Sequence, residues 1–147
     1  MDVMHASHCT YRIRYHMIFV VKYRRKMLLE RTRIEFLKEL CVEIGKRYWF
    51  EFDAIGVDGD HFHVVVGAAP RHSPSGIMQA IKSITAKQIF ERYPYLRDEL
   101  WGGEFWSDGG HIDTVGHSGG LDVIRRYVEN QGKKREEGRA QLSLLSF

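Results

Sequence analysis

The sequence predicts an α+β fold in which helices cover one face of an antiparallel sheet. Short alternating or apolar runs are typical of strands, two longer stretches carry apolar residues every three or four positions as helices do, and turn residues separate them. The chain has 147 residues, of which 44% are hydrophobic and 28% are charged. This size and balance predict one globular domain with a substantial core rather than a disordered chain.

The first half of the chain has the order strand, helix, strand, strand. Apolar and aromatic residues alternate with polar ones over residues 11–21, which predicts a long strand entering a buried sheet. Residues 30–48 carry apolar side chains on one helical face. Residues 50–57 and 61–68 are typical of strands, and the Asp-Gly-Asp turn at 58–60 predicts that they form a hairpin.

The second half adds a helix and a last strand. Pro74 and Ser75 open a helix that Pro94 ends. Residues 105–106 and 111–115 are candidate short strands in a glycine-rich segment. The resulting order, βαββαβ, predicts a ferredoxin-like sandwich with an antiparallel sheet.

The end of the chain is separated from this core by glycines at positions 116, 119 and 120. Such glycines either form a flexible joint or are ordinary turn residues. We therefore expect a single domain over residues 1–147, with a core at about 8–116, a C-terminal helix at about 119–137 that carries Tyr127, and a tail at 138–147.

Charge and cysteine content bear on partners and location. The formal net charge is only +3, but basic residues crowd positions 22–33 and 133–139. Each cluster is either a polyanion-binding surface or a solvated face. The two cysteines form no CxxC pair, no basic and apolar leader opens the chain, and no apolar stretch approaches the length of a membrane span. We therefore expect a cytoplasmic protein without a membrane partner.

Two short motifs carry the chemistry. His61 and His63 alternate along a predicted strand, so both imidazoles project from one face at a spacing that suits one divalent ion. Tyr127 and Gln131 are four residues apart and would share one face of the final helix. Taken alone, the histidines are also typical of hydrogen-bonded strand residues and the tyrosine of a core position. None of the other six tyrosines has a glutamine four residues later.

The order and spacing of these motifs resemble the single-tyrosine HUH transposases of IS200-like insertion sequences. The resemblance rests on the opening strand at 15–25, the Asp-His-Phe-His motif at 60–63, the aromatic segment at 100–116 and the tyrosine helix at 126–131. It departs from the family at the Asp-Gly-Asp turn, where relatives often have a proline-containing turn.

The resemblance implies a metal-dependent enzyme. It implies binding to single-stranded DNA hairpins near the ends of a mobile element, and cleavage and rejoining of strands through a 5′-phosphotyrosine intermediate. Tyr127 would be the nucleophile, and His61, His63 and Gln131 would hold Mg²⁺ or Mn²⁺. It also implies a homodimer, in which the histidines of one subunit meet the tyrosine helix of the other.

Further candidates would contact DNA. Five basic residues are our candidates for phosphate contacts, which position a nucleic acid without reading its bases: Arg24, Arg25, Lys82, Lys87 and Arg92. Three aromatic residues either stack on unpaired bases or belong to a core or interface: Trp101, Phe105 and Trp106.

The remaining polar residues near the motifs keep open interpretations. Asp58 and Asp60 either add a ligand or a base, or serve only as turn residues. His16 is interpreted as structural, whereas His111 and His117 receive no assignment.

Other functions remain as alternatives. They are a palindrome-associated transposase relative, another HUH endonuclease of the replication-initiator type, and a non-catalytic ferredoxin-like module that binds nucleic acid. A histidine phosphoesterase is disfavoured, because the sequence lacks a second histidine motif and Val65 stands where a third histidine would be.

Overall fold

The computed structural model describes residues 3–116 and 120–131, and it confirms the predicted α+β class. Within these residues, a four-stranded antiparallel sheet has the order β4-β5-β3-β6. The strands are β3 (Tyr15–Val20), β4 (Glu51–Asp58), β5 (His61–Gly67) and β6 (His111–Thr114). Because β5 lies between β3 and β4, the two strands that the first long helix connects, the sheet has the split βαβ arrangement of a ferredoxin-like sandwich.

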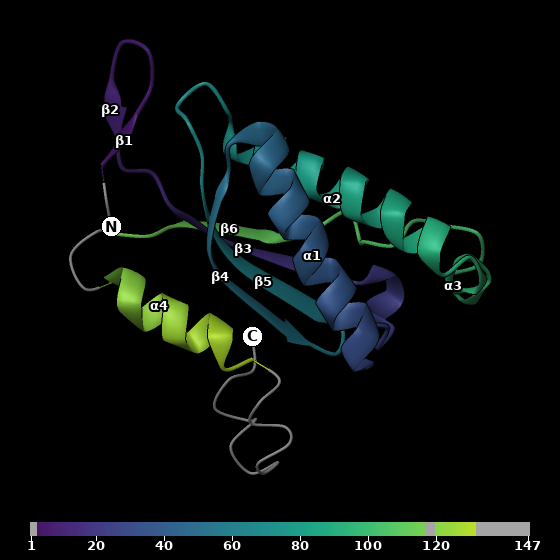
Figure 1. Ribbon diagram of the computed structural model, residues 1–147. Helices are drawn as coiled ribbons and strands as arrows, with labels where there is room; N and C mark the ends of the chain where they lie inside the picture. Colours follow the sequence, from purple (N-terminus) through teal and green to yellow (C-terminus); the bar gives the residue numbers. More distant parts are fainter. Residues whose placement is uncertain (1–2, 117–119, 132–147) are drawn as a thin grey trace.

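The helices lie on both faces of this sheet (Figure 1). The long helices α1 (Arg31–Tyr48) and α2 (Pro74–Arg92) cover one face, and α4 (Gly120–Glu129) lies on the other. Smaller elements complete the description: β1 (Met4–His5), β2 (Thr10–Tyr11), η1 (Lys22–Arg24) and α3 (Tyr95–Glu99). None of the helices in the described part of the chain is both long and apolar enough to cross a membrane.

The main core lies between the sheet and the helices α1 and α2. Alternate residues of the central strands, such as Phe19 and Phe62, are fully buried there, and they pack with Leu37, Ile44 and Ile81 of the helices. Burying one such side chain contributes about 2 kcal/mol through the hydrophobic effect. The period of two along a strand then places the intervening residues on the opposite face, beneath α4.

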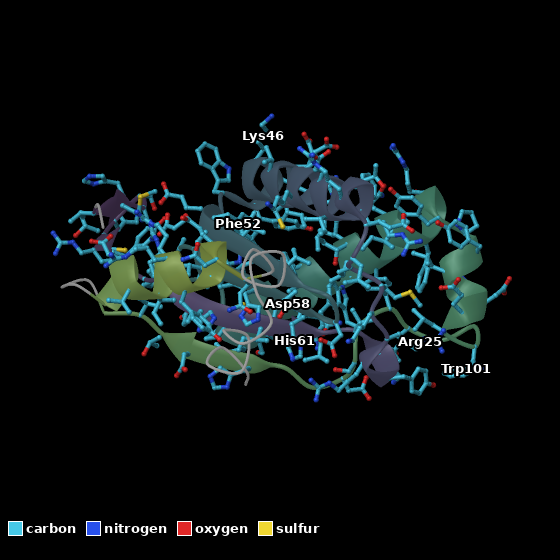
Figure 2. The ribbon with its side chains drawn as sticks, turned by 90° about the horizontal axis from the view of Figure 1, so that it is seen from below. Arg25, Lys46, Phe52, Asp58, His61 and Trp101 are labelled. Atoms are coloured by element: carbon cyan, nitrogen blue, oxygen red, sulfur yellow. The ribbon has the colours of Figure 1, made fainter. Side chains whose placement is uncertain are left out.

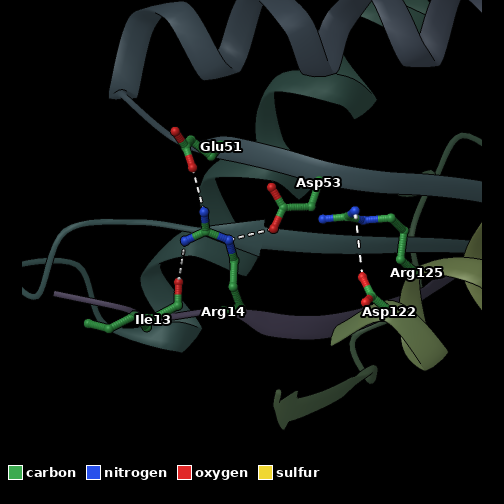
Figure 3. Close-up of polar contacts among 6 residues, drawn as sticks. All are labelled: Ile13, Arg14, Glu51, Asp53, Asp122 and Arg125. Carbon is green, nitrogen blue, oxygen red and sulfur yellow. Dashed lines mark hydrogen bonds and ion pairs between the residues drawn. The ribbon is translucent and has the colours of Figure 1, made fainter. Parts of the chain in front are cut away.

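The predicted strand over residues 11–21 begins too early. The regular strand starts at Tyr15, and residues 10–11 instead pair with residues 4–5 in a separate small sheet. Arg14 accounts for part of the change, because its buried guanidinium turns toward β4 and forms ion pairs of 2.5 Å with Glu51 and Asp53 (Figure 3).

One further predicted element is wrong, and the predicted C-terminal helix is described only in part. Residues 105–106 do not form a strand, and Trp106 makes only an isolated bridge with Val21. Of the predicted helix at 119–137, residues 120–129 are helical, while 117–119 and 132–147 lie outside the described residues.

Arg14→Ala is expected to lower the free energy of unfolding by about 3 kcal/mol. The change removes the buried guanidinium and leaves the carboxylates of Glu51 and Asp53 without their shared cation. Urea unfolding followed by circular dichroism measures this change. Arg31→Ala is the matched control, since the Arg31–Glu35 pair is exposed and its loss should change stability by less than about 0.5 kcal/mol. Equal effects of the two substitutions would contradict the structural role of Arg14.

Candidate active site

A row of histidines lies on the sheet face beneath α4. His61 and His63 project from the same face of β5, with ring centroids 6.1 Å apart. His16 of β3 stacks on His63 at 5.7 Å between ring centroids, and its Nε2 lies 3.5 Å from Nδ1 of His63. The strand alternation therefore does bring the two predicted ligands together, and the pairing of β3 with β5 adds a third imidazole.

His61 is oriented by its neighbour in the turn. A carboxylate oxygen of Asp60 lies 2.5 Å from Nδ1 of His61, and the other oxygen lies 3.2 Å from Nε of Arg24. Burial by itself would raise the pKa of Asp60, but the contacts with His61 and Arg24 lower it below its usual value. A carboxylate bound to Nδ1 fixes the ring and directs Nε2 outward, which is the usual support for a histidine that ligates a metal.

His63 is held as a neutral imidazole. Its side chain is fully buried, and burial together with the nearby His16 and His61 lowers its pKa to about 3. A neutral ring keeps a nitrogen lone pair at physiological pH, and a nitrogen needs this lone pair to accept a hydrogen bond or to ligate a metal.

Helix α4 places Tyr127 against this pair. The Tyr127 ring meets the His63 ring edge to face, with 6.3 Å between centroids. Burial raises the pKa of Tyr127, a hydrogen bond with Gln131 opposes that rise, and the charge of Asp58 adds to it. The phenol is therefore protonated at neutral pH and requires a nearby cation or base before it can attack.

A glycine in β4 allows α4 to come this close. A Cβ atom built on Gly56 would overlap the carbonyl oxygen of Val128 and would lie 3.2 Å from Cβ of Gln131. Gly56 faces His63 across the β4–β5 pair, and Ala54 and Val65 pack with Val128 beside it. We call these contacts the α4 seat: Gly56 and Ala54 of β4, Val65 of β5, and Val128 and Gln131 at the end of α4.

A pocket of about 710 Å³ opens beside the histidines, between the sheet and α4. His61 and Tyr127 line it, together with His16 and the apolar residues Ile18 and Ile124. A volume of this size accommodates a nucleotide-sized group.

The predicted metal ligands suit a divalent ion by their chemistry. Gln131 is buried just after the end of α4, beside Tyr127, and its side-chain carbonyl oxygen is the kind of ligand that divalent ions accept. His61 and His63 supply imidazole nitrogens on the same face. Within residues 3–116 and 120–131, no three His, Cys, Asp or Glu side chains are grouped to hold a metal, so the set depends on the glutamine.

The predicted phosphate contacts lie on different elements and make different contacts. Lys82 donates hydrogen bonds to the carbonyl oxygens of residues 107–109, at 2.9–3.2 Å, and Arg92 lies over the ring of Phe36. Lys87 is exposed on α2. Arg24 and Arg25 lie near the turn that carries Asp60, as the ion pair of Arg24 shows.

The aromatic residues of the late segment divide by burial. Phe105 and Trp106 are 1% and 3% exposed and belong to the core, where Trp106 donates a hydrogen bond to Thr85. Base stacking on these two residues is therefore excluded in this structure, whereas Trp101 is 69% exposed. His111 lies 2.7 Å from Asp113 on the surface, and His117 lies outside the described residues.

Sequence reasoning missed the positions of Gly56 and His16. A glycine within a strand pattern signals a close backbone approach, and Gly56 interrupts the apolar run of residues 54–57 in this way. The contact of His16 with His63 depends on the register of β3 against β5, which no local pattern encodes.

A family model described as "Transposase IS200 like" matches residues 9–131. The chain belongs to this IS200-like transposase family.

Individual relatives agree with this assignment. The ISDra2 transposase TnpA of Deinococcus radiodurans is 32% identical over 124 residues, which cover 84% of this chain and 87% of that protein. The transposase for insertion sequence element IS200 of Salmonella typhimurium is 27% identical over an alignment of 148 positions, gaps included, which covers 97% of this chain and 91% of that one.

Solved structures share the fold. A crystal structure of a protein named as a transposase, from Deinococcus radiodurans R1, superposes with a TM-score of 0.69 at 29% identity, over 87% of this chain and 97% of that one. A REP-associated tyrosine transposase bound to a REP hairpin gives a TM-score of 0.60 at 14% identity, over 92% and 75% of the two chains. The second likeness concerns the fold alone.

Proposed function

We propose that this protein is a DNA transposase that cleaves and rejoins single-stranded DNA through a covalent bond to Tyr127. The observation that carries the proposal is the edge-to-face contact of Tyr127 with His63, on the face that also presents His61. In a chain of this transposase family, this contact brings the proposed nucleophile and the histidine pair together beside one pocket.

The proposed cleavage is an exchange of one phosphoester for another. The Tyr127 oxygen attacks the phosphorus, the bond from phosphorus to the 3′ oxygen breaks, and the phenolic proton is lost while the 3′ oxygen leaves as a hydroxyl. The DNA 5′ end then remains attached to the tyrosine. Attack of a 3′ hydroxyl on this phosphotyrosine reverses the exchange, so rejoining needs no nucleotide hydrolysis.

His61, His63 and Gln131 would hold Mg²⁺ or Mn²⁺, which supplies Lewis-acid polarisation of the scissile phosphate. Asp60 positions His61 for this role through the contact at Nδ1. Gln131 has a second task, because its hydrogen bond to Tyr127 favours the ionised phenol against the effect of burial.

The proposed substrate is a single strand folded into a hairpin near the end of a mobile element. The REP-associated relative was solved with a hairpin, and the pocket beside Tyr127 accepts a nucleotide-sized group. The exposed basic residues Arg24, Arg25 and Lys87 are proposed phosphate contacts.

The test is formation of a denaturation-resistant adduct. The protein is incubated with Mn²⁺ and a hairpin that carries single-stranded flanks and a 3′ label, because the fragment on the 3′ side of the cut is the one that stays attached to Tyr127. Products are separated on a denaturing protein gel. The expected result is a labelled band at the mass of protein plus DNA fragment, which a chelator abolishes. Metal-independent binding with no adduct on any hairpin from the bordering DNA would reject the enzyme and favour a non-catalytic binding module.

We also propose a homodimer that exchanges α4 between subunits. A swapped helix would occupy the same α4 seat, because a domain swap keeps the contacts and changes only the chain that supplies them. Neither His63→Ala nor Tyr127→Phe alone should form the adduct. When the two variants are mixed and exchange subunits, half of the dimers contain one copy of each, and one of the two sites in such a dimer is intact. The mixture should therefore recover about a quarter of wild-type activity. No recovery, despite subunit exchange shown by light scattering of tagged chains, would assign the site to one chain.

A further inference from the structure

An exposed cluster of aromatic and cationic side chains lies outside the pocket. Tyr23 and Trp101 are 56% and 69% exposed, and their rings meet edge to face with 4.9 Å between centroids. The guanidinium of Arg25 lies 5.5 Å from the Trp101 ring, and the ammonium of Lys22 lies 5.7 Å from the Tyr23 ring. Figure 2 shows Arg25 and Trp101 side by side. We call these four residues the Tyr23–Trp101 cluster.

The backbone holds the cluster in an unusual conformation. Tyr23 and Arg24 are consecutive residues with φ of 60° and 54°, a left-handed region that side chains rarely adopt outside helix ends. The segment is anchored on both sides, because the amide of Val21 donates to the carbonyl of Asp60, 2.9 Å away, and the amide of Leu28 donates to Gly59 at the same distance. The fold therefore maintains two adjacent strained residues where a large aromatic ring faces solvent.

The same segment is connected to the candidate active site. Arg24 forms its ion pair with Asp60, and Asp60 contacts Nδ1 of His61. One carboxylate thus joins the end of the cluster segment to the first predicted metal ligand. A strand bound across the cluster would therefore lie on a segment that is ion-paired with the turn before His61.

The chemistry of the cluster suits an unpaired nucleic-acid base. Exposed aromatic rings offer π faces on which any base stacks, and adjacent cations neutralise the phosphates that flank it. The basic run continues through the exposed Lys26, which adds a further cation to the segment that carries Tyr23. A duplex cannot use these rings, since its bases are already stacked.

We propose that the Tyr23–Trp101 cluster is a stacking site for an unpaired base of the single strand that leads to the active site. The inference rests on the proposed function for its substrate, and it adds a binding site outside the pocket. Trp101 supplies the principal stacking surface, Tyr23 supports its edge, and Arg25 and Lys22 contact the adjoining phosphates.

The test compares two exposed tryptophans. Fluorescence anisotropy measures affinity for a labelled oligothymidine of about 15 nucleotides, with chelator present so that no cleavage occurs. Trp101→Ala is expected to weaken binding about 10-fold and Trp101→Phe much less, because the second variant keeps a ring. Trp49 is the matched control, because it also has a left-handed backbone conformation and is 79% exposed. Trp49→Ala should bind as wild type does, since Trp49 lies at the end of α1 and not in the cluster.

Two further readouts separate stacking from other causes. The slope of log affinity against log salt should be unchanged in Trp101→Ala and reduced by about 1 in Arg25→Ala, since only arginine releases a counterion. In Trp49→Phe, binding should quench the emission of Trp101, because the third tryptophan, Trp106, is buried. Melting temperatures near that of wild type would show that each variant is folded.

The outcomes distinguish this proposal from the proposed function. Equal oligothymidine affinities for folded Trp101→Ala and wild type would overturn the stacking site even where wild type forms the DNA adduct. If wild type forms no adduct but Trp101→Ala still weakens oligothymidine binding about 10-fold, the proposed enzyme is rejected and the stacking site is retained. Concentration-dependent self-association that Trp101→Ala abolishes, with affinity for DNA unchanged, would assign the cluster to a contact between copies of the chain.

Discussion

Tyr127→Phe is expected to abolish the covalent protein–DNA adduct and to reduce strand cleavage at least 1,000-fold, on the order expected for loss of a nucleophile. The substitution removes one oxygen atom and keeps the ring, so the edge-to-face contact with His63 should persist. The free energy of unfolding should therefore change by less than about 1 kcal/mol. Quantification of the labelled adduct on denaturing gels, beside urea unfolding, measures both effects.

The control for this prediction is another tyrosine. Tyr95→Phe removes an exposed hydroxyl that accepts a hydrogen bond from Arg33, at the start of α3. It should form the adduct at the wild-type rate. An adduct that persists in Tyr127→Phe at the wild-type level would place the nucleophile on a different side chain.

Gly56→Ala is expected to reduce adduct formation about 100-fold while leaving the main core intact. The new methyl group would occupy the position of the Val128 carbonyl oxygen, so the end of α4 must move away from β4. A displacement of about 1 Å at a reacting group costs on the order of 100-fold in rate. The methyl lies on the face opposite Phe62 and the other residues beneath α1 and α2, which remain packed.

Gly109→Ala is the matched control, because a Cβ atom there has no neighbour within 4 Å. Rates of adduct formation for the two variants are compared in saturating Mn²⁺, and thermal unfolding establishes that both are folded. Gly56→Val should reduce the rate further, since its side chain is larger. Wild-type rates in folded Gly56→Ala and Gly56→Val would show that α4 does not act from the α4 seat.

The sequence was sufficient where local periodicity decides the structure. The hairpin of β4 and β5 and the helices α1 and α2 lie close to their predicted positions, because alternation and amphipathic spacing are local properties. The same reasoning predicted that His61 and His63 share a face, which the register of β5 confirms. Their roles as ligands stay a prediction.

The remaining features depend on contacts between distant segments. Arg14 lies inside the predicted strand but before the observed one, and its guanidinium forms ion pairs with carboxylates 37 and 39 residues later in the sequence. Trp101 and Trp106 have the same chemistry and nearby positions in the chain, yet one is exposed and the other is buried. Packing against Thr85 and Phe19 decides the second case, and a single sequence does not show which aromatic residue finds such neighbours.

The helices on the two faces of the sheet are attached to it through apolar clusters of very different size. The side under α1 and α2 holds an extensive apolar interior, whereas α4 is held to the other side by a small cluster around Ala54, Val65 and Val128. Detaching α4 would expose few apolar groups and would leave the interior on the far side dry. The sheet and its main core are therefore expected to stay folded when α4, which carries Tyr127, leaves the sheet or is replaced by the α4 of a second copy.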